Sequence, residues 1–99
     1  MWNPVESARN WVSNFERSIR DVDGTVELSV NDETNVSATI CIQLNKRIGY
    51  YTVWLNGPTF DIFVAHQHDI LPLIALEGSL SEENDVERHM KLVLDTLNS

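Results

Sequence analysis

The chain has 99 residues, which is enough for one domain, residues 1–99, with a modest apolar core. Its 15 acidic side chains oppose 7 basic ones, and the net charge of −8 disfavours nucleic acids and anionic membranes as partners. The charge attracts basic proteins, although it can also serve solubility alone.

The cysteine content and the first residues indicate a cytoplasmic protein. Cys41 is the only cysteine, so no disulfide can form within the chain. Residues 1–6 lack the basic and apolar regions of a secretory signal. No apolar run approaches the ~20 residues that a membrane-spanning helix needs.

Residues 3–22 are predicted to form a helix. Asn3 can cap its first turn, and Pro4 suits the first helical position. Apolar residues recur at spacings of three and four, which indicates one buried stripe. The stripe consists of Val5, Ala8, Val12, Phe15, Ile19 and Val22, and Trp11 widens it. Asp23 and Gly24 are expected to end the helix.

The apolar period then changes to two, which is typical of half-buried strands. Four strands are predicted, at residues 26–30, 36–42, 48–55 and 59–66. Short polar turns between them favour antiparallel pairing. The apolar run 70–76 is a possible fifth strand, and Pro72 would confine it to an edge of the sheet. Residues 77–79 are expected to form a turn.

A second helix is predicted to begin after Ser81, which would cap it, with Glu82 and Glu83 in its first turn. Its buried stripe consists of Val86, Met90, Val93 and Leu97, with Leu94 beside it. The element order predicts an α+β fold. An antiparallel meander of four to five strands would carry the N-terminal and C-terminal helices on one face.

Such a fold leaves the other face of the sheet uncovered. If Tyr51 and Val53 point towards the helices, alternation turns a set of aromatic and acidic residues outward. This candidate partner-binding set is Trp54, Tyr50, Phe63, Asp61 and Glu27. Large rings with nearby carboxylates suit the capture of a basic protein. With the opposite register of the third strand, Trp54 and Tyr50 would instead be core residues.

The residues with catalytic or metal-binding potential do not form a recognisable site. His66 and His68 could share a cation only if both lay on one strand face, and two imidazoles fall short of a structural zinc site. Cys41 lacks a basic environment that would activate it. The acidic run 82–87 is typical of a solvated helix start. We therefore expect no catalytic residue, cofactor or metal.

Residues 47–64, RIGYYTVWLNGPTFDIFV, resemble the central hairpin of small immunity proteins from bacterial polymorphic-toxin systems. The similarity is to the TriTu-type immunity proteins, which pair with Rhs toxins that ADP-ribosylate elongation factor Tu. In that family a strand ending in Thr-Val-Trp, a turn with glycine and a strand with aspartate precede a terminal helix. The resemblance implies an inhibitor that binds the toxin domain and blocks its NAD or target-binding site. It assigns no contact residue.

The sequence is therefore compatible with four functions. The leading hypothesis is a monomeric immunity protein that neutralises a basic toxin domain. The alternative is a secretion-type chaperone, which would hold an extended effector segment and usually dimerise. An enzyme that uses residues 66–69 is the third hypothesis, and a structural subunit of a larger complex is the fourth.

Overall fold

The chain runs from a helix through five strands to a second helix. The computed structural model describes residues 2–32, 34–69 and 71–99. The elements are α1 (Pro4–Asp21), β1 (Thr25–Asn31), β2 (Ser37–Leu44), β3 (Arg47–Trp54), β4 (Thr59–His66), β5 (Pro72–Ser79) and α2 (Asn84–Leu97). The strands form one antiparallel meander in the order β1-β2-β3-β4-β5.

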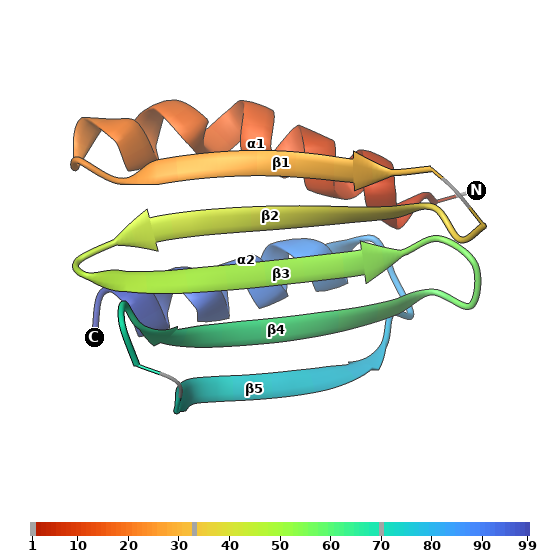
Figure 1. Cartoon of the computed structure of the whole chain (residues 1–99). Coiled ribbons are helices and arrows are strands. Elements are labelled where there is room, and N and C mark those ends of the chain that lie inside the picture. Colours follow the sequence, from red (N-terminus) through yellow and green to blue (C-terminus); the bar gives the residue numbers. More distant parts are fainter. Residues whose placement is uncertain (1, 33, 70) are drawn as a thin grey trace.

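Both helices lie on the same side of this sheet. Figure 1 shows α1 behind the sheet along β1, and α2 behind β3 and β4, with β5 at the margin beyond α2. The predicted α+β meander with two helices on one face is therefore confirmed. Within the described part of the chain, neither helix combines the length and the apolar character that crossing a bilayer requires.

The start of α1 follows the predicted capping pattern. The Asn3 side chain accepts hydrogen bonds from the backbone N–H groups of Val5 and Glu6, at 2.9 and 3.3 Å. The predicted stripe is wrong at two positions. Val22 is 60% exposed because the helix ends at Asp21. Phe15 is 37% exposed and stacks on the buried Trp11 instead of entering the core.

The register of the sheet turns one set of alternating residues towards the helices. In β3, Tyr51 and Val53 are fully buried, and they face the buried Ile62 and the half-buried Phe60 of β4. The same alternation buries Ile40 and Ile42 in β2. Together with residues of both helices these side chains form one core cluster. Tyr50 and Trp54 therefore belong to the opposite face, as the first of the two registers predicts.

The β2–β3 turn fixes the end of α2. Asn45 and Lys46 both have positive φ angles, 57° and 62°, which suits a two-residue hairpin turn. The Asn45 side-chain amide donates to the Leu97 carbonyl oxygen at 3.1 Å. The Arg47 guanidinium donates to the Thr96 carbonyl oxygen at 2.7 Å. These bonds satisfy carbonyl groups that a helix end leaves without partners.

The start of α2 differs from the prediction. Ser81 precedes the helix but does not cap it, because the helix begins at Asn84. The Glu83 side chain, at the N-cap position, makes no capping hydrogen bond. Asp85 in the first turn is 2% exposed, so this member of the acidic run is not solvated. Its carboxylate accepts hydrogen bonds from the Ser81 hydroxyl and from the N–H groups of Ser81 and Glu82, and it pairs with Arg88.

The predicted fifth strand is confirmed, but its bounds differ from the prediction. β5 runs from Pro72 to Ser79, so the turn predicted at residues 77–79 is wrong. The predicted first residue, Ile70, lies outside the described residues. Pro72 lies on an edge strand, as predicted, and a register shift between Val64 and Ala65 accompanies it.

Candidate functional site

All five predicted partner-binding residues lie on the side of the sheet opposite the helices, here called the open face. Its outward residues include Glu27, Ser29, Thr39, Cys41, Tyr50, Thr52, Trp54, Asp61, Phe63 and Glu77, which the strand register places together. Because the side chains of a strand alternate, every one of them points away from the core.

The structure brings Tyr50 and Phe63 into direct contact at the centre of the open face. They are cross-strand partners, and their ring centroids lie 6.4 Å apart. Tyr50 is 40% exposed, and Phe63 is half-buried. Glu27 lies in the same cross-strand row, separated from Tyr50 by Cys41. This row combines an apolar centre with a carboxylate at its end.

Trp54 and Asp61 lie apart from the aromatic pair. Trp54 follows Tyr50 by four residues on β3, which separates their Cα atoms by roughly 13 Å along the strand. The row between them contains a hydroxyl pair, since the Oγ1 atoms of Thr39 and Thr52 are 2.9 Å apart. Asp61 continues this row beside Thr52. The predicted set is therefore one surface with two centres.

Glu77 is an open-face residue that the sequence prediction missed. It lies directly opposite Asp61 on the neighbouring strand, and both residues are exposed. Like charges in facing cross-strand positions repel each other. A positively charged group placed beside the two carboxylates would relieve this repulsion.

A shallow hollow, here called the Trp54 hollow, lies next to the two carboxylates. Its volume is about 490 Å³, and it is lined by Trp54, Thr59, Phe60, Asp61, Glu77, Gly78 and Ser79. An indole ring beside two carboxylates is a favourable environment for a guanidinium or ammonium group. This end of the open face is thus suited to a basic side chain.

Cys41 lies between Glu27 and Tyr50 in the same cross-strand row of the open face. Burial raises its pKa, and the charge of Glu27 raises the pKa further, against the opposing effect of a hydrogen bond with Tyr50. A raised pKa reduces the thiolate fraction, which is the nucleophilic form. Cys41 contributes a small, partly exposed surface between Glu27 and Tyr50.

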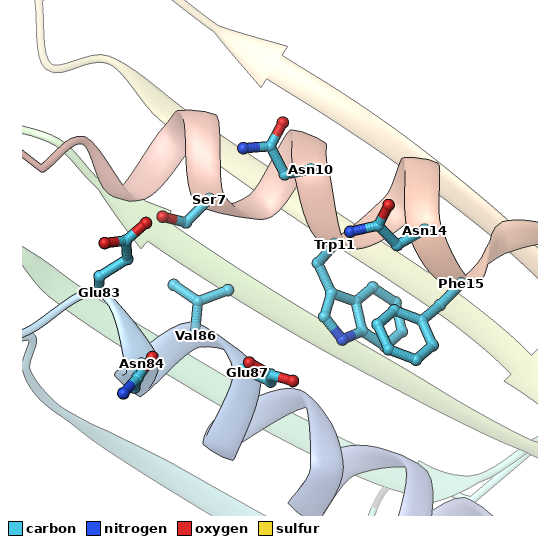
Figure 2. A pocket seen from close by; sticks show the side chains of 9 residues that line it. All are labelled: Ser7, Asn10, Trp11, Asn14, Phe15, Glu83, Asn84, Val86 and Glu87. Atoms are coloured by element: carbon cyan, nitrogen blue, oxygen red, sulfur yellow. The ribbon is translucent and has the colours of Figure 1, made fainter.

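The second surface of interest is a groove between α1 and α2, here called the interhelix groove. Figure 2 shows the rings of Trp11 and Phe15 projecting from α1 towards α2. The rings are stacked, with centroids 4.9 Å apart. Two adjoining hollows of about 240 and 380 Å³ share these two rings together with Asn84 and Glu87.

The rim of the interhelix groove is polar. Ser7, Asn10 and Asn14 contribute it from α1, Asn84 and Glu87 from α2, and Glu83 from the residue before α2. Amide, hydroxyl and carboxylate groups around an aromatic floor can bind a ligand through hydrogen bonds. The sequence prediction missed this groove because it assigned Phe15 to the core. The one available signal was the spacing of Trp11 and Phe15, four residues apart on a helix.

The three histidines are far from forming a common site. β4 ends at His66, and His68 follows in a turn with a φ of 70°, so the two do not share a strand face. His89 lies on α2, where its Nδ1 is 2.8 Å from the Tyr51 hydroxyl and its ring lies against Phe60. In residues 2–32, 34–69 and 71–99, no three histidine, cysteine or acidic side chains gather as metal ligands would.

Comparison with known proteins assigns no family to this chain. No family model, no curated protein and no solved structure matches it. Its function must therefore be argued from the chemistry of the open face and of the interhelix groove.

Proposed function

We propose that this chain is a non-enzymatic, cytoplasmic inhibitor of the immunity-protein kind, which binds a basic toxin domain through its open face. The observation that carries the proposal is the Tyr50–Phe63 pair. The two rings are cross-strand neighbours, with centroids 6.4 Å apart, on the sheet face opposite both helices. Aromatic residues at the centre of a patch provide most of the binding energy in protein interfaces.

The charge distribution supports a basic partner. Glu27 lies at one end of the aromatic row, and the facing pair Asp61 and Glu77 lies at the other side of the open face. With a net charge of −8 the whole molecule attracts a cationic protein, and the carboxylates near the rings set its orientation. The resemblance of residues 47–64 to the hairpin of TriTu-type immunity proteins agrees with this function and suggests an ADP-ribosyltransferase as the toxin.

The test is rescue of growth. The protein encoded by the neighbouring reading frame is expressed in a bacterial host with and without this chain, and growth is measured together with the affinity of the purified pair. We expect the chain to restore growth and Tyr50→Ala to weaken binding by about tenfold or more. Ser29→Ala, at another position on the open face, is the matched control and should bind normally. A neighbouring protein that is toxic and is not neutralised, or full affinity of Tyr50→Ala, would refute the proposal.

A secretion-type chaperone is the second candidate, because β5 exposes apolar side chains along the margin of the sheet. Leu73 and Leu76 are 40% and 47% exposed. A chaperone that holds an extended effector segment needs such a surface. Gel filtration of the isolated chain distinguishes the two candidates, since an obligate dimer favours the chaperone and a monomer favours the inhibitor.

A further inference from the structure

The two edges of the sheet are protected to different degrees. β1 forms one edge, and α1 packs along it (Figure 1). β5 forms the other edge, beyond the strands that α2 covers. Leu76 shows that α2 leaves the helix side of β5 partly uncovered. It points to the helix side, opposite the fully buried Ile62, but it is 47% exposed.

The backbone of β5 presents hydrogen-bonding groups to solvent. The Leu80 N–H donates to the Pro58 carbonyl oxygen at 2.8 Å, which continues the β4–β5 ladder by one pair. In an antiparallel ladder, hydrogen-bonded pairs alternate with pairs that are not bonded. Leu76 and Gly78 therefore bond to β4, whereas the N–H and C=O groups of Ala75 and Glu77 point away from it.

Part of this edge lacks the features that usually prevent strand addition. Proline, bulges and lysine side chains commonly block exposed edges. Pro72 and the register shift at Val64 and Ala65 block the first end of β5. Residues 73–79 contain no lysine or arginine, and every one of them except Ile74 is exposed. This stretch is therefore accessible to another strand.

The charges beside the edge indicate what kind of strand would bind. Glu77 already faces Asp61, and the Trp54 hollow adjoins both. A strand added to β5 would place a side chain directly beside Glu77, where a positive charge is favourable and a negative charge is not. A second copy of this chain would bring its own Glu77 and another net charge of −8. A basic segment is thus favoured over self-association.

We propose that an extended, basic segment of the partner protein adds to β5 as a sixth strand. Its backbone bonds to the outward groups of Ala75 and Glu77, as in other cases of strand addition. Its apolar side chains cover Leu76 on the helix side, and its lysine or arginine side chains lie beside Glu77 on the open face. The inference rests on the proposed function, because it describes how the same basic partner extends past the open face.

The test uses a synthetic peptide in which lysine and valine alternate, and it follows backbone amide exchange of the full chain by NMR. We expect the peptide to slow the exchange of the Ala75 and Glu77 amides by about tenfold or more, and to leave the β1 amides unchanged. A peptide that alternates glutamate and valine should have no such effect. Protection elsewhere in the chain, or none at all, would overturn the proposal. So would protection of both amides before peptide is added, since that indicates a second copy.

Two variants make the test specific. Ala75→Pro removes one outward N–H group, and proline is tolerated at such edge positions. It should weaken peptide binding by about tenfold at an unchanged unfolding midpoint, whereas Val30→Pro on the β1 edge should bind the peptide normally. If Ala75→Pro does not fold, Glu77→Lys replaces it and should reverse the preference between the two peptides. An unchanged preference would refute the proposal.

The failure of this inference is distinguishable from the failure of the proposed function. Tyr50→Ala alters the open face and not the edge, so it should bind the lysine–valine peptide normally. If Tyr50→Ala loses growth rescue and Ala75→Pro retains it fully, the inhibitor function stands and strand addition is refuted. If no neighbouring toxin is neutralised but the peptide protects Ala75 and Glu77, strand addition stands without the inhibitor function.

Discussion

Tyr50 and Tyr51 are neighbours in β3, yet they lie in opposite environments. Tyr51 is fully buried on the helix side, where its hydroxyl is 2.8 Å from His89 Nδ1. Tyr50 is 40% exposed on the open face, between Cys41 and Phe63. The helix side of β3 belongs to the core, and its other side carries large rings that are partly exposed.

Because of this difference, a substitution of Tyr51 should affect stability, whereas a substitution of Tyr50 should affect binding. A side chain that is partly exposed on the uncovered face of a sheet stabilises the protein less than a core residue does. The same strand therefore offers a structural residue and a candidate binding residue one position apart. Substitutions at the two positions test the distinction directly.

The largest expected effect is on the free energy of unfolding. Tyr51→Ala should lower it by about 3–5 kcal/mol, because the change leaves a cavity in the core and removes the partner of His89. Tyr50→Ala should lower it by less than about 1 kcal/mol, because the ring is already partly in solvent. Urea denaturation followed by tryptophan fluorescence measures both values.

Tyr51→Phe is the matched control for the hydrogen bond. It keeps the ring and leaves the half-buried His89 Nδ1 without the hydroxyl, at a cost of about 1–2 kcal/mol. Equal destabilisation by Tyr50→Ala and Tyr51→Ala would mean that the two faces do not differ as described, and the open face would lose its interpretation as a free binding surface.

Alternation made the helix-covered face predictable from sequence. In β2 the apolar residues follow a period of two, and hydrophobic burial fixes which side faces the helices. β3 carries large apolar residues on both faces, so alternation alone leaves two registers open for it. β5 has no such period. Gly78 looked like a turn residue, but it lies in the strand opposite Phe60, whose Cε1 would be 3.1 Å from a Cβ at that position. A glycine that makes room for a ring on the next strand cannot be identified from local sequence.

The candidate site was predictable to the same extent as the strands. Tyr50, Trp54 and Phe63 lie on the open face, which is the first of the two registers that the sequence leaves open for β3. Glu77 was missed because its strand was ended too early. The interhelix groove was missed for a different reason, since the place of Phe15 depends on how far α2 lies from α1, and no local pattern encodes that distance.

A smaller effect is expected from pH through His89, on the covered face. Burial, and then the neighbouring charge of Arg88, lower the pKa of His89 below its ordinary value of 6.5. The folded chain thus binds this proton less readily than the unfolded chain. The contribution of His89 to stability is complete above pH 6.5 and is lost as the pH falls from there through the lowered pKa. Denaturation midpoints between pH 8 and pH 5 measure the loss, over roughly the range in which histidine titrates.

His89→Gln provides the control for this pH dependence. Glutamine can still hydrogen-bond to the Tyr51 hydroxyl but does not titrate, so the loss of stability towards acid should be smaller in the variant. At alkaline pH the dependence of stability on pH has the opposite sign. Burial raises the pKa of Tyr51, so its contribution is complete below its ordinary value of 10.0 and is lost at higher pH. If the stability of His89→Gln falls towards acid pH as steeply as that of the unchanged chain, His89 is not the cause of the loss.

The smallest expected effect is on the reactivity of Cys41, and it reports on the open face. Because burial and the Glu27 charge raise the pKa of this thiol, alkylation by iodoacetamide at pH 8 should be slower than for an unstructured cysteine peptide. Glu27→Gln should accelerate it by no more than about twofold, since an exposed charge is well screened. Glu77→Gln removes an equal charge at the far side of the sheet and should leave the rate unchanged. Equal acceleration by both variants would mean that net charge, and not the row from Glu27 to Phe63, sets the environment of Cys41. In that case the carboxylates of the open face would attract a partner without orienting it.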